Sequence, residues 1–391
     1  MRGPGLRCCR RAAPLFIFAF FFTLGFNAKY ISEKHRLTFI PRFGRKNIER
    51  EGKTSHVAAE SSDGKRSPAD TVGPHSFIKP KESNDKKQSE QSEQETGILA
   101  RQKWEPFKDR HDFPYIFNNR AKCFNTKTNT FDKLTLIVVI ASKPDHFEQR
   151  NIMRLTWIKH TMENAYAVRV VFLLGLPSEN NVQHRIKHES MLHGDIVQES
   201  FLDTYLNLTV KTIGALKWAS RSCPRAKYFM KLDDDVMVDI GNLTGFLELR
   251  AEKSGYFGGI LHENATAIRS PREKWFVPDE IYPLSTYPPY AEGKAYILSM
   301  DVVKKVLRIS SDVAVFPWED IYVGLCAKQV GIAPRDILSF HFMWDVRNST
   351  NGRLIKTAKS LRKLNIMYIA YDLNTRQMLD VWKAWKLNSW D

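Results

Sequence analysis

The sequence lacks the short motifs that identify several large classes of protein. It has no G-x-G-x-x-G fingerprint and no P-loop, so neither a dinucleotide nor a P-loop phosphate cradle is expected. None of its five cysteines has metal-ligand spacing, and no zinc-finger, recognition-helix or RNP-like pattern accompanies its basic residues. A phosphate-bearing partner would therefore have to be held in another way, for example by a metal ion.

The sequence also has too few acidic residues to balance its basic ones, and its formal net charge is +16 over 391 residues. Lys and Arg are spread through residues 1–110 and over the later part of the chain, so no single nucleic-acid-binding tract stands out. We therefore expect an anionic membrane surface and a phosphate-bearing substrate as partners, and no nucleic acid.

One long apolar run lies near the N-terminus, at residues 15–26, and several arginines precede it. Because basic residues stay on the cytoplasmic side, the rest of the chain is expected in the lumen or outside the cell. A cleaved signal peptide is the alternative, but the best cleavage position, after Ala28, has bulky Phe26 at minus three. We predict a cytoplasmic tail over residues 1–11 and a type II transmembrane signal anchor over residues 12–28.

Residues 29–103 are poor in apolar side chains and rich in Ser, Glu, Gln, Lys and Gly. Such a segment buries too little apolar surface to offset its conformational entropy, so it is predicted to be a disordered stem. From Trp104 the composition becomes globular, and residues 104–391 are predicted to form one lumenal domain.

The cysteines fall into two groups. Cys8 and Cys9 lie just before the apolar run and are either palmitoylated or unmodified. In a lumenal domain, one disulfide and one free thiol are expected among Cys123, Cys223 and Cys326, and the sequence leaves all three pairings open.

Strand and helix patterns alternate along the globular part. Strands are predicted at residues 131–142, 168–174, 195–197 and 228–232, and helices at residues 146–158, 179–191 and 204–220. This alternation predicts an α/β fold with a mostly parallel, doubly wound central sheet, whose ligand lies in a crevice at the carboxyl ends of the strands.

Three consecutive carboxylates, Asp233, Asp234 and Asp235, follow the predicted strand 228–232 directly. In extended backbone, Asp233 and Asp235 face the same side while Asp234 faces away. A divalent cation relieves the repulsion among them, and hard carboxylate oxygens suit Mg²⁺ or Mn²⁺. The alternative is a solvated acidic turn that closes the strand.

A second carboxylate pair, Glu319 and Asp320, opens a predicted helix over residues 317–332. Capping of the helix N-terminus explains Glu319 as well as a functional role does. Asp320 is the stronger candidate for a general base. A helix N-terminus lowers the pKa of its carboxyl whereas burial raises that pKa, and spacing alone does not decide between them.

Four N-glycosylation sequons lie beyond the stem and agree with a lumenal domain. Their asparagines are Asn207, Asn242, Asn264 and Asn348.

Six motifs that contain these residues follow one another in a fixed order: RNIMRLTW at 150–157, VVFLLG at 170–175, DIVQESFLDTYLNLTVKT at 195–212, YFMKLDDDVMVD at 228–239, KWFVPDEIYPLSTYPPYAEGKAYILS at 274–299 and WEDIYVG at 318–324. From about Phe113 onward, the chain resembles the β-1,3-galactosyltransferase and β-1,3-N-acetylglucosaminyltransferase family of Golgi type II glycosyltransferases. The anchor and stem are similar to the layout of that family without sharing a motif with it.

The resemblance implies a GT-A type, Rossmann-like domain that uses a UDP-sugar with Mn²⁺ or Mg²⁺. Asp233 to Asp235 match the D-x-D motif, in which Asp235 is the favoured metal ligand and Asp233 a second one. Asp233 and Asp234 would also steady the nucleotide. Asp320 matches the catalytic base.

The resemblance also assigns contacts around the substrates. Arg150, Arg154 and Trp157 match one motif of the family. Arg150 or Arg154 is expected to meet the diphosphate, with core and helix-face packing as the alternative, whereas Trp157 is expected to pack in the core. Residues expected to contact the acceptor or the sugar are Trp275, Tyr287, Tyr290 and Glu319; Pro288 and Gly293 belong to the same loop motif and also fit a rigid turn.

One position departs from the family pattern. Many members have a metal-binding histidine where this chain has Tyr371. His341 is a possible substitute, although a single His in an aromatic stretch is more often a packed core residue. The third metal ligand therefore stays open between these two.

The reaction implied is a single displacement. Asp320 removes the proton of the acceptor 3-hydroxyl, UDP leaves, and the transferred galactose or N-acetylglucosamine inverts to a β-1,3 linkage. The acceptor is a glycan on a glycoprotein or glycolipid, the place of action is the Golgi lumen, and a homo-oligomer stays open. Two alternatives are a catalytically inactive, membrane-tethered glycan-binding protein and a metal-dependent phosphohydrolase.

Overall fold

The computed structural model describes residues 112–249, 251–343 and 369–386, without the side chains of 341–343. The predicted tail, signal anchor and stem lie outside these residues. In the described ranges, no helix is both long enough and apolar enough to cross a membrane.

The strands of the described part are β1 (Tyr115–Phe117), β2 (Phe124–Asn125), β3 (Thr130–Phe131), β4 (Leu134–Ala141), β5 (Val168–Leu176), β6 (Ile196–Leu202), β7 (Ala226–Asp233), β8 (Met237–Val238), β9 (Phe257–His262), β10 (Tyr290–Ser299), β11 (Arg335–Asp336) and β12 (Ile369–Ala370). The α-helices are α3 (Phe147–Met153), α4 (Lys159–Glu163), α5 (Asn180–His193), α6 (Leu208–Ser222), α7 (Ile240–Leu249), α8 (Met300–Ile309), α9 (Glu319–Gln329) and α11 (Thr375–Lys386). Shorter helical turns are η1 (Arg120–Lys122), η2 (Arg154–Ile158), η3 (Tyr205–Asn207) and η4 (Leu338–Met343).

Eight strands form the central sheet, in the order β1-β6-β5-β4-β7-β10-β9-β11. The four strands β6, β5, β4 and β7 are mutually parallel, and β10 runs antiparallel to both β7 and β9. The chain leaves β4 toward β5 and β6 on one side, and later returns to place β7 on the other. The predicted α/β fold with a mostly parallel sheet is confirmed, and its topological switch point lies between β4 and β7.

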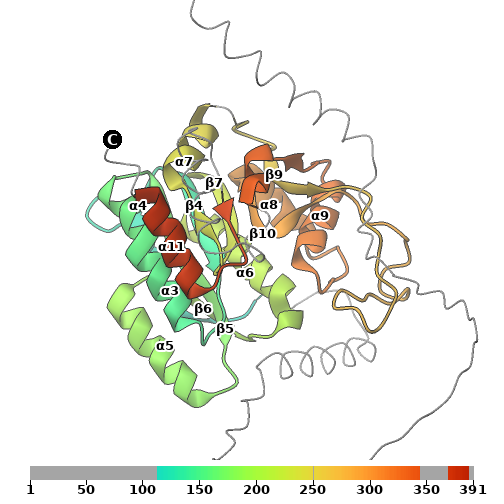
Figure 1. The fold of residues 1–391 in the computed structure, drawn as a ribbon, viewed down its shortest axis with the longest axis horizontal. Helices are drawn as coiled ribbons and strands as arrows, with labels where there is room; N and C mark the ends of the chain where they lie inside the picture. Colours follow the sequence, from blue (N-terminus) through green and yellow to red (C-terminus); the bar gives the residue numbers. More distant parts are fainter. Residues whose placement is uncertain (1–111, 250, 344–368, 387–391) are drawn as a thin grey trace, which may run out of the picture. The chain divides into compact units, whose positions relative to one another are not determined.

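Helices cover both faces of this sheet because its central strands are apolar on both sides. Along β4, alternate side chains enter the two halves of the core: Leu136, Val138 and Ile140 enter one, and Ile137 and Val139 the other. Helices α3, α5, α7 and α11 pack on the first side, where Figure 1 shows α3 and α11 side by side. Helices α6, α8 and α9 pack together on the second side.

The helix predicted over residues 146–158 has a different end and an interruption. After α3 the chain makes one π-helical turn, η2, and continues through α4 to Glu163. At Thr156 the backbone leaves the helical region, with φ −110° and ψ −110°, and the Thr156 hydroxyl donates to the Ile152 carbonyl at 2.6 Å. This local hydrogen bond of a threonine side chain competes with the regular helix pattern and accompanies the distortion.

The disulfide joins Cys123 to Cys223, which ties the segment before β2 to the end of α6, and Cys326 is a buried free thiol. The structure thus selects one of the three pairings that the sequence left open.

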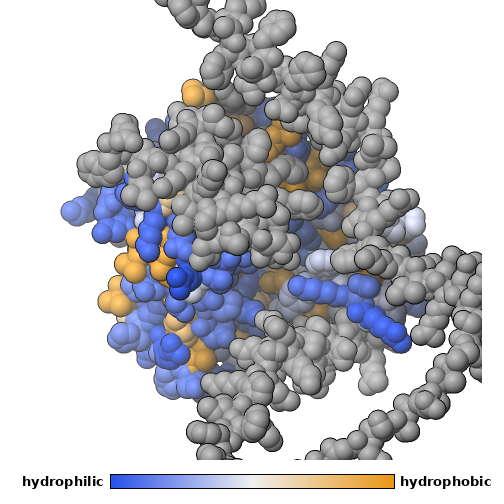
Figure 2. All heavy atoms as spheres, in the orientation of Figure 1, coloured by the Kyte–Doolittle hydropathy of each residue, from blue (hydrophilic) through white to orange (hydrophobic). Residues whose placement is uncertain are grey.

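Apolar and hydrophilic side chains are interspersed on the face of the described residues that Figure 2 shows. Isolated exposed apolar residues such as Leu155 and Met162 are normal on a globular surface.

Candidate functional site

The aspartate triplet lies at the switch point of the sheet. Asp233 is the last residue of β7 and pairs with Ala141, the last residue of β4. The carboxyl ends of both strands therefore meet where the three carboxylates begin. This is the place where open α/β sheets bind their ligands.

Asp234, the middle carboxylate, is turned toward the segment that follows β4. Its Oδ2 accepts hydrogen bonds from the Ser142 hydroxyl at 2.6 Å and the Lys143 amide at 3.2 Å, and lies 2.9 Å from Nδ1 of His146. Burial opposes ionisation of Asp234, but the bonds from His146 and Ser142 hold the pKa of this carboxyl below its usual range. Asp234 thus fastens the end of β7 to the loop after β4.

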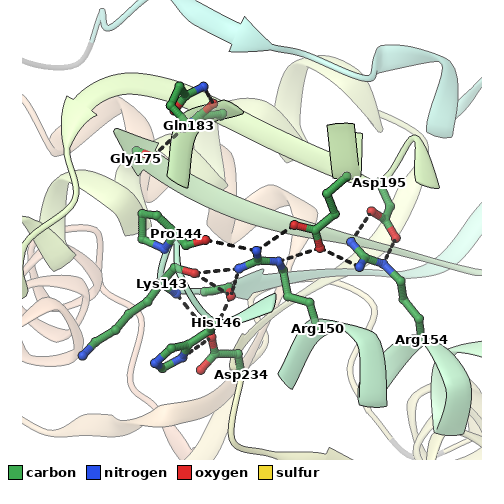
Figure 3. A network of polar contacts seen from close by, with 12 residues as sticks. Lys143, Pro144, His146, Arg150, Arg154, Gly175, Gln183, Asp195 and Asp234 are labelled. Atoms are coloured by element: carbon green, nitrogen blue, oxygen red, sulfur yellow. Dashed lines mark hydrogen bonds and ion pairs between the residues drawn. The ribbon is translucent and has the colours of Figure 1, made fainter. Parts of the chain in front are cut away.

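Arg150 holds that loop from the other side, as Figure 3 shows. Its side chain is fully buried and donates to the hydroxyl of Ser142 at 3.0 Å and to the carbonyls of Lys143 at 2.6 Å and Pro144 at 3.1 Å. The same guanidinium forms two bonds to Glu189, at 2.7 and 2.9 Å. Protein acceptors therefore already surround the group that the sequence assigned to a diphosphate, and Arg150 positions the loop in this structure.

Arg154 continues the same network one helical turn further on. It bonds Glu189 at 2.6 Å and makes two bonds of 2.8 Å to Asp195, so it too is engaged by protein carboxylates. Trp157 is 1% exposed and belongs to the core, as expected.

Lys231 connects the triplet to the second carboxylate pair. This lysine is buried inside β7, and its Nζ lies 2.7 Å from Asp233 and 2.9 Å from Glu319 and also bonds the Gly293 carbonyl. Burial alone lowers the pKa of the ammonium, but the two carboxylates raise it above its usual value, so the group stays charged. Lys231 fixes Asp233, the start of α9 and β10 relative to one another.

Asp320 lies in the first turn of α9 and faces β10. Its Oδ1 accepts the amide of Ile321 at 2.8 Å, and its Oδ2 accepts the amide of Gly293 at 3.1 Å. Burial and the charge of neighbouring Glu319 raise the pKa of Asp320 to about 7, against the lowering effect of these amides. Burial thus outweighs the helix N-terminus, and Asp320 is poised to exchange a proton near neutral pH.

Glu319 points into the protein. It is 5% exposed and accepts hydrogen bonds from the hydroxyls of Thr212 at 2.9 Å and Tyr296 at 3.0 Å, in addition to its ion pair with Lys231. The expected contact of Glu319 with a sugar does not match this position, because its carboxylate is turned toward partners below the surface. Its role in this structure is to hold Lys231.

Asp235 is the carboxylate of the triplet that best fits a metal ion. Its Oδ1 is buried and has no hydrogen-bond partner among the described residues. Burial and the charges of Asp233, Asp234 and Asp372 raise its pKa to about 7, so the site as it stands is short of positive charge. A hard carboxylate oxygen in this state fits Mg²⁺ or Mn²⁺.

Within the described ranges, no group of three or more His, Cys, Asp or Glu is arranged to hold a metal ion. Mg²⁺ sites commonly combine one or two carboxylates with substrate phosphates and water, and the arrangement here fits that kind of site. Tyr371 is 2% exposed. The ammonium of Lys294 lies over its ring, 4.2 Å from the ring centroid. The side chain of His341 lies outside the described residues.

Several aromatic side chains lie in β9, β10 and the loop between these strands. Tyr290 stacks on His262 with ring centroids 5.0 Å apart and an interplanar angle of 18°. Tyr287 is buried among aromatic rings, including that of Tyr290, and its hydroxyl has no hydrogen-bond partner among the described residues. Trp275 is 54% exposed and belongs to the loop before β10. Tyr290, His262 and Trp275 thus offer ring faces or edges to a ligand.

The sequon asparagines differ in their surroundings. Asn264 is exposed, whereas the amide of Asn207 donates to the Leu202 carbonyl and that of Asn242 to Asp239. Asn348 lies outside the described residues.

Sequence reasoning missed four residues of this site. Lys231 carried a usable signal, because a charged residue inside an apolar strand run is normally buried with a partner. His146, Lys294 and Asp372 carried none, since each joins the site through a partner distant in sequence.

Comparisons with known proteins agree with the motifs. Residues 148–337 match the family model described as Galactosyltransferase. The chain is 36% identical over 204 residues to beta-1,3-galactosyltransferase 5 of Homo sapiens, covering 52% of this chain and 66% of that protein. The namesake from Pan troglodytes is 35% identical and is covered to 69%. Beta-1,3-galactosyltransferase 1 of Mus musculus is 31% identical over 274 residues, which cover 70% of this chain and 78% of that protein.

Among solved structures, a glycosyltransferase involved in glycosylation of the major capsid of PBCV-1 aligns with a TM-score of 0.33 and 13% identity, over 63% of this chain and 98% of that one. A mannosyltransferase from Pyrobaculum calidifontis, in complex with GDP-Man and Mn²⁺, aligns with a TM-score of 0.26 and 10% identity, over 70% and 69%. The sequence relatives decide the assignment, and the chain belongs to the β-1,3-galactosyltransferase family.

Proposed function

We propose that this protein transfers a hexose or N-acetylhexosamine from a UDP-sugar to the 3-hydroxyl of an acceptor glycan, with inversion to a β-1,3 linkage. Galactose is the first candidate because of the family, and N-acetylglucosamine is the second. The observation that carries the proposal is the link from Asp320 to the aspartate triplet: Gly293 bonds Asp320 through its amide and Lys231 through its carbonyl. The proposed base and the proposed metal-binding centre thus share one polar network.

Asp320 is the proposed base. A carboxylate with a pKa of about 7 accepts a proton more readily than an ordinary aspartate does near neutral pH. The acceptor oxygen forms a bond to the anomeric carbon while the bond from that carbon to the diphosphate breaks. The hydroxyl proton passes to Asp320, and UDP leaves with the electron pair. One displacement without a carboxylate nucleophile inverts the anomeric centre.

Asp235 would hold Mn²⁺ or Mg²⁺, with Asp233 beside it, in a domain of GT-A type. The support is the buried, unpartnered Oδ1 of Asp235. The bound ion would offset the charge that develops on the leaving diphosphate. Asp234 supports this centre indirectly, because its bonds to Ser142 and Lys143 hold the turn in place.

The rings of Tyr290 on β10 and Trp275 in the loop before it are the proposed acceptor subsite. Tyr290, held by stacking on His262, and the exposed Trp275 suit the apolar faces of sugar rings. Tyr287 packs against Tyr290 and supports this subsite.

We also propose that residues 12–28 anchor the protein in the Golgi membrane as a single-pass type II protein with a lumenal domain. The arginines before the apolar run support this orientation. The Cys123–Cys223 disulfide agrees with an oxidising compartment.

The test is a transfer assay with the full-length chain in detergent, a panel of UDP-sugars and β-linked acceptor glycans, and either Mn²⁺ or EDTA. Asp320→Asn is compared with Asp312→Asn, which alters an exposed aspartate in the turn after α8. Transfer that Asp320→Asn abolishes and Asp312→Asn preserves supports the proposal, and the panel identifies the donor. Binding of a glycan without any transfer indicates the inactive binding protein, and hydrolysis of a UDP-sugar without acceptor indicates the phosphohydrolase.

A further inference from the structure

Lys294 lies on β10 between the two carboxylate centres of the site. The preceding residue, Gly293, bonds Asp320 through its amide at 3.1 Å. The ammonium of Lys294 bonds Asp372, and the residue after Asp372, Leu373, donates its amide to the carbonyl of Asp235 at 3.2 Å. The lysine is thus connected through neighbouring residues to the proposed base on one side and to the proposed metal ligand on the other.

The surroundings of the ammonium hold it without enclosing it. It lies over the ring of Tyr371 at 4.2 Å, pairs with Asp372, and is 3.5 Å from Glu292. The side chains of Lys294 and Asp372 are 20% and 22% exposed, so both remain in contact with solvent. Lys231, by contrast, is 4% exposed in its side chain and is closed in between Asp233 and Glu319. Of these two lysines, only Lys294 can reach a ligand without a rearrangement of the core.

The positive charge of Lys294 lies among several carboxylates. Glu292 and Asp372 place carboxylates around the ammonium of Lys294, and the aspartate triplet adds further negative charge nearby. The site must still receive a donor whose diphosphate adds further negative charge. A flexible lysine is well suited to this task because its ammonium acts as a mobile point charge toward phosphate.

We propose that Lys294 binds the diphosphate of the donor directly, as a cation built into the chain beside the metal position, and that its ammonium exchanges the ion pair with Asp372 for the diphosphate while the ring of Tyr371 supports it. This inference rests on the proposed function, because it requires a UDP-sugar at the triplet. It predicts that UDP keeps measurable affinity after divalent metal is removed, and that this affinity depends on Lys294. Tyr371, where many relatives have a metal-binding histidine, would then serve as the platform of this lysine.

The test is isothermal titration of UDP into the full-length protein in detergent, once with EDTA and once with saturating Mn²⁺. In EDTA, Lys294→Met is expected to weaken UDP binding by about tenfold or more, the usual effect of losing one hydrogen bond to a charged group. Lys294→Arg is expected to retain most of the affinity. Lys305→Met is the matched control, because its ammonium pairs with Asp301 on α8, outside this network. Uridine, which has no phosphate, is expected to bind the wild type and Lys294→Met equally.

A second variant covers the possibility that Lys294→Met folds poorly. Asp372→Asn removes the carboxylate that competes for the ammonium, so UDP should bind several-fold more tightly in EDTA. Equal UDP affinity of the wild type and Lys294→Met in EDTA, or wild-type binding only with Mn²⁺, would overturn the inference while leaving the proposed function intact. Failure of the wild type to bind UDP even with Mn²⁺ would overturn both.

Discussion

The main-chain amide of Gly293 donates to Oδ2 of Asp320 at 3.1 Å, and this contact requires the absence of a side chain at position 293. A Cβ atom there would lie 2.8 Å from Oε1 of Glu319 and 3.3 Å from Oδ2 of Asp320. The backbone of β10 can therefore approach both carboxylates of α9 only with glycine at this point.

Gly293→Ala should impair catalysis more than folding. Displacement of a catalytic group on the order of 1 Å costs up to about 100-fold in rate, whereas overpacking typically costs about 1–3 kcal/mol of stability. The measurements are kcat/KM and the free energy of unfolding in urea. Gly245→Ala is the control, since nothing lies within 4 Å of its added Cβ and it lies inside α7. Unchanged kcat/KM in Gly293→Ala would show that this contact does not position Asp320.

The pH dependence of the reaction should report the raised pKa of Asp320. The ionised carboxylate of Asp320 is the proposed base, so kcat/KM at saturating Mn²⁺ should rise tenfold per pH unit below about 7 and level off above it. A profile that is flat from pH 5 to pH 8 would contradict the assignment of Asp320.

The carboxyl of Asp320 should also make stability depend on pH, with stability falling as pH rises, whereas kcat/KM rises. Its pKa is higher in the folded protein than in the unfolded chain, where it is near the ordinary value of 3.8. The folded state therefore binds the proton more tightly, and this contribution to stability is lost as pH rises from about 4 through about 7. Relative to the wild type, Asp320→Asn should gain thermal stability between pH 4 and pH 8. A wild-type minus variant difference in Tm that does not change with pH would refute this linkage.

Arg150→Ala should destabilise the fold severely. It removes five hydrogen bonds and leaves Glu189 buried with one fewer cation, a change that typically costs about 3–5 kcal/mol. Arg272→Ala, at an exposed position in the loop before β10, should change stability by no more than about 0.5 kcal/mol. Urea unfolding of both variants gives the comparison, and similar midpoints would exclude a supporting role for Arg150.

The cysteines should differ sharply in reactivity. In a Cys8→Ser, Cys9→Ser background, the folded protein should show almost no reaction with a thiol reagent at neutral pH, because Cys326 is buried and its pKa is raised to about 12. Unfolding without reductant should expose one thiol per chain. Replacing Cys123 and Cys223 by serine should lower stability by about 2–5 kcal/mol and expose no further thiol. Three reactive thiols in the unfolded, unreduced protein would disprove the disulfide.

The sequence was sufficient for features that depend on neighbours along the chain. The apolar run before Asp233 predicted β7 and placed the triplet at its end. The pattern after Trp318 predicted α9 and placed Asp320 in its first turn. Both follow from local burial and periodicity, which a single sequence carries.

What the sequence did not reveal depends on contacts between distant residues. The sequence showed that the helix N-terminus and burial change the pKa of Asp320 in opposite directions. Which effect is larger depends on how closely β10 covers the carboxyl. Likewise, nothing in the motif that contains Arg150 distinguishes an arginine that binds phosphate from one that binds Glu189 and the loop after β4. The antiparallel placement of β10 between β7 and β9 was likewise not predicted.

The pairing of β12 with β8 has a consequence for biosynthesis. Ile369 lies opposite Val238 and Ala370 opposite Met237, only a few residues after the aspartates. The ribosome synthesises the aspartate triplet long before β12, the strand that pairs with β8. The site around the triplet can therefore fold completely only after the last part of the chain has been made. A nonsense or frameshift allele that spares every proposed site residue up to Asp320 but ends before Ile369 should therefore yield an unstable, inactive protein.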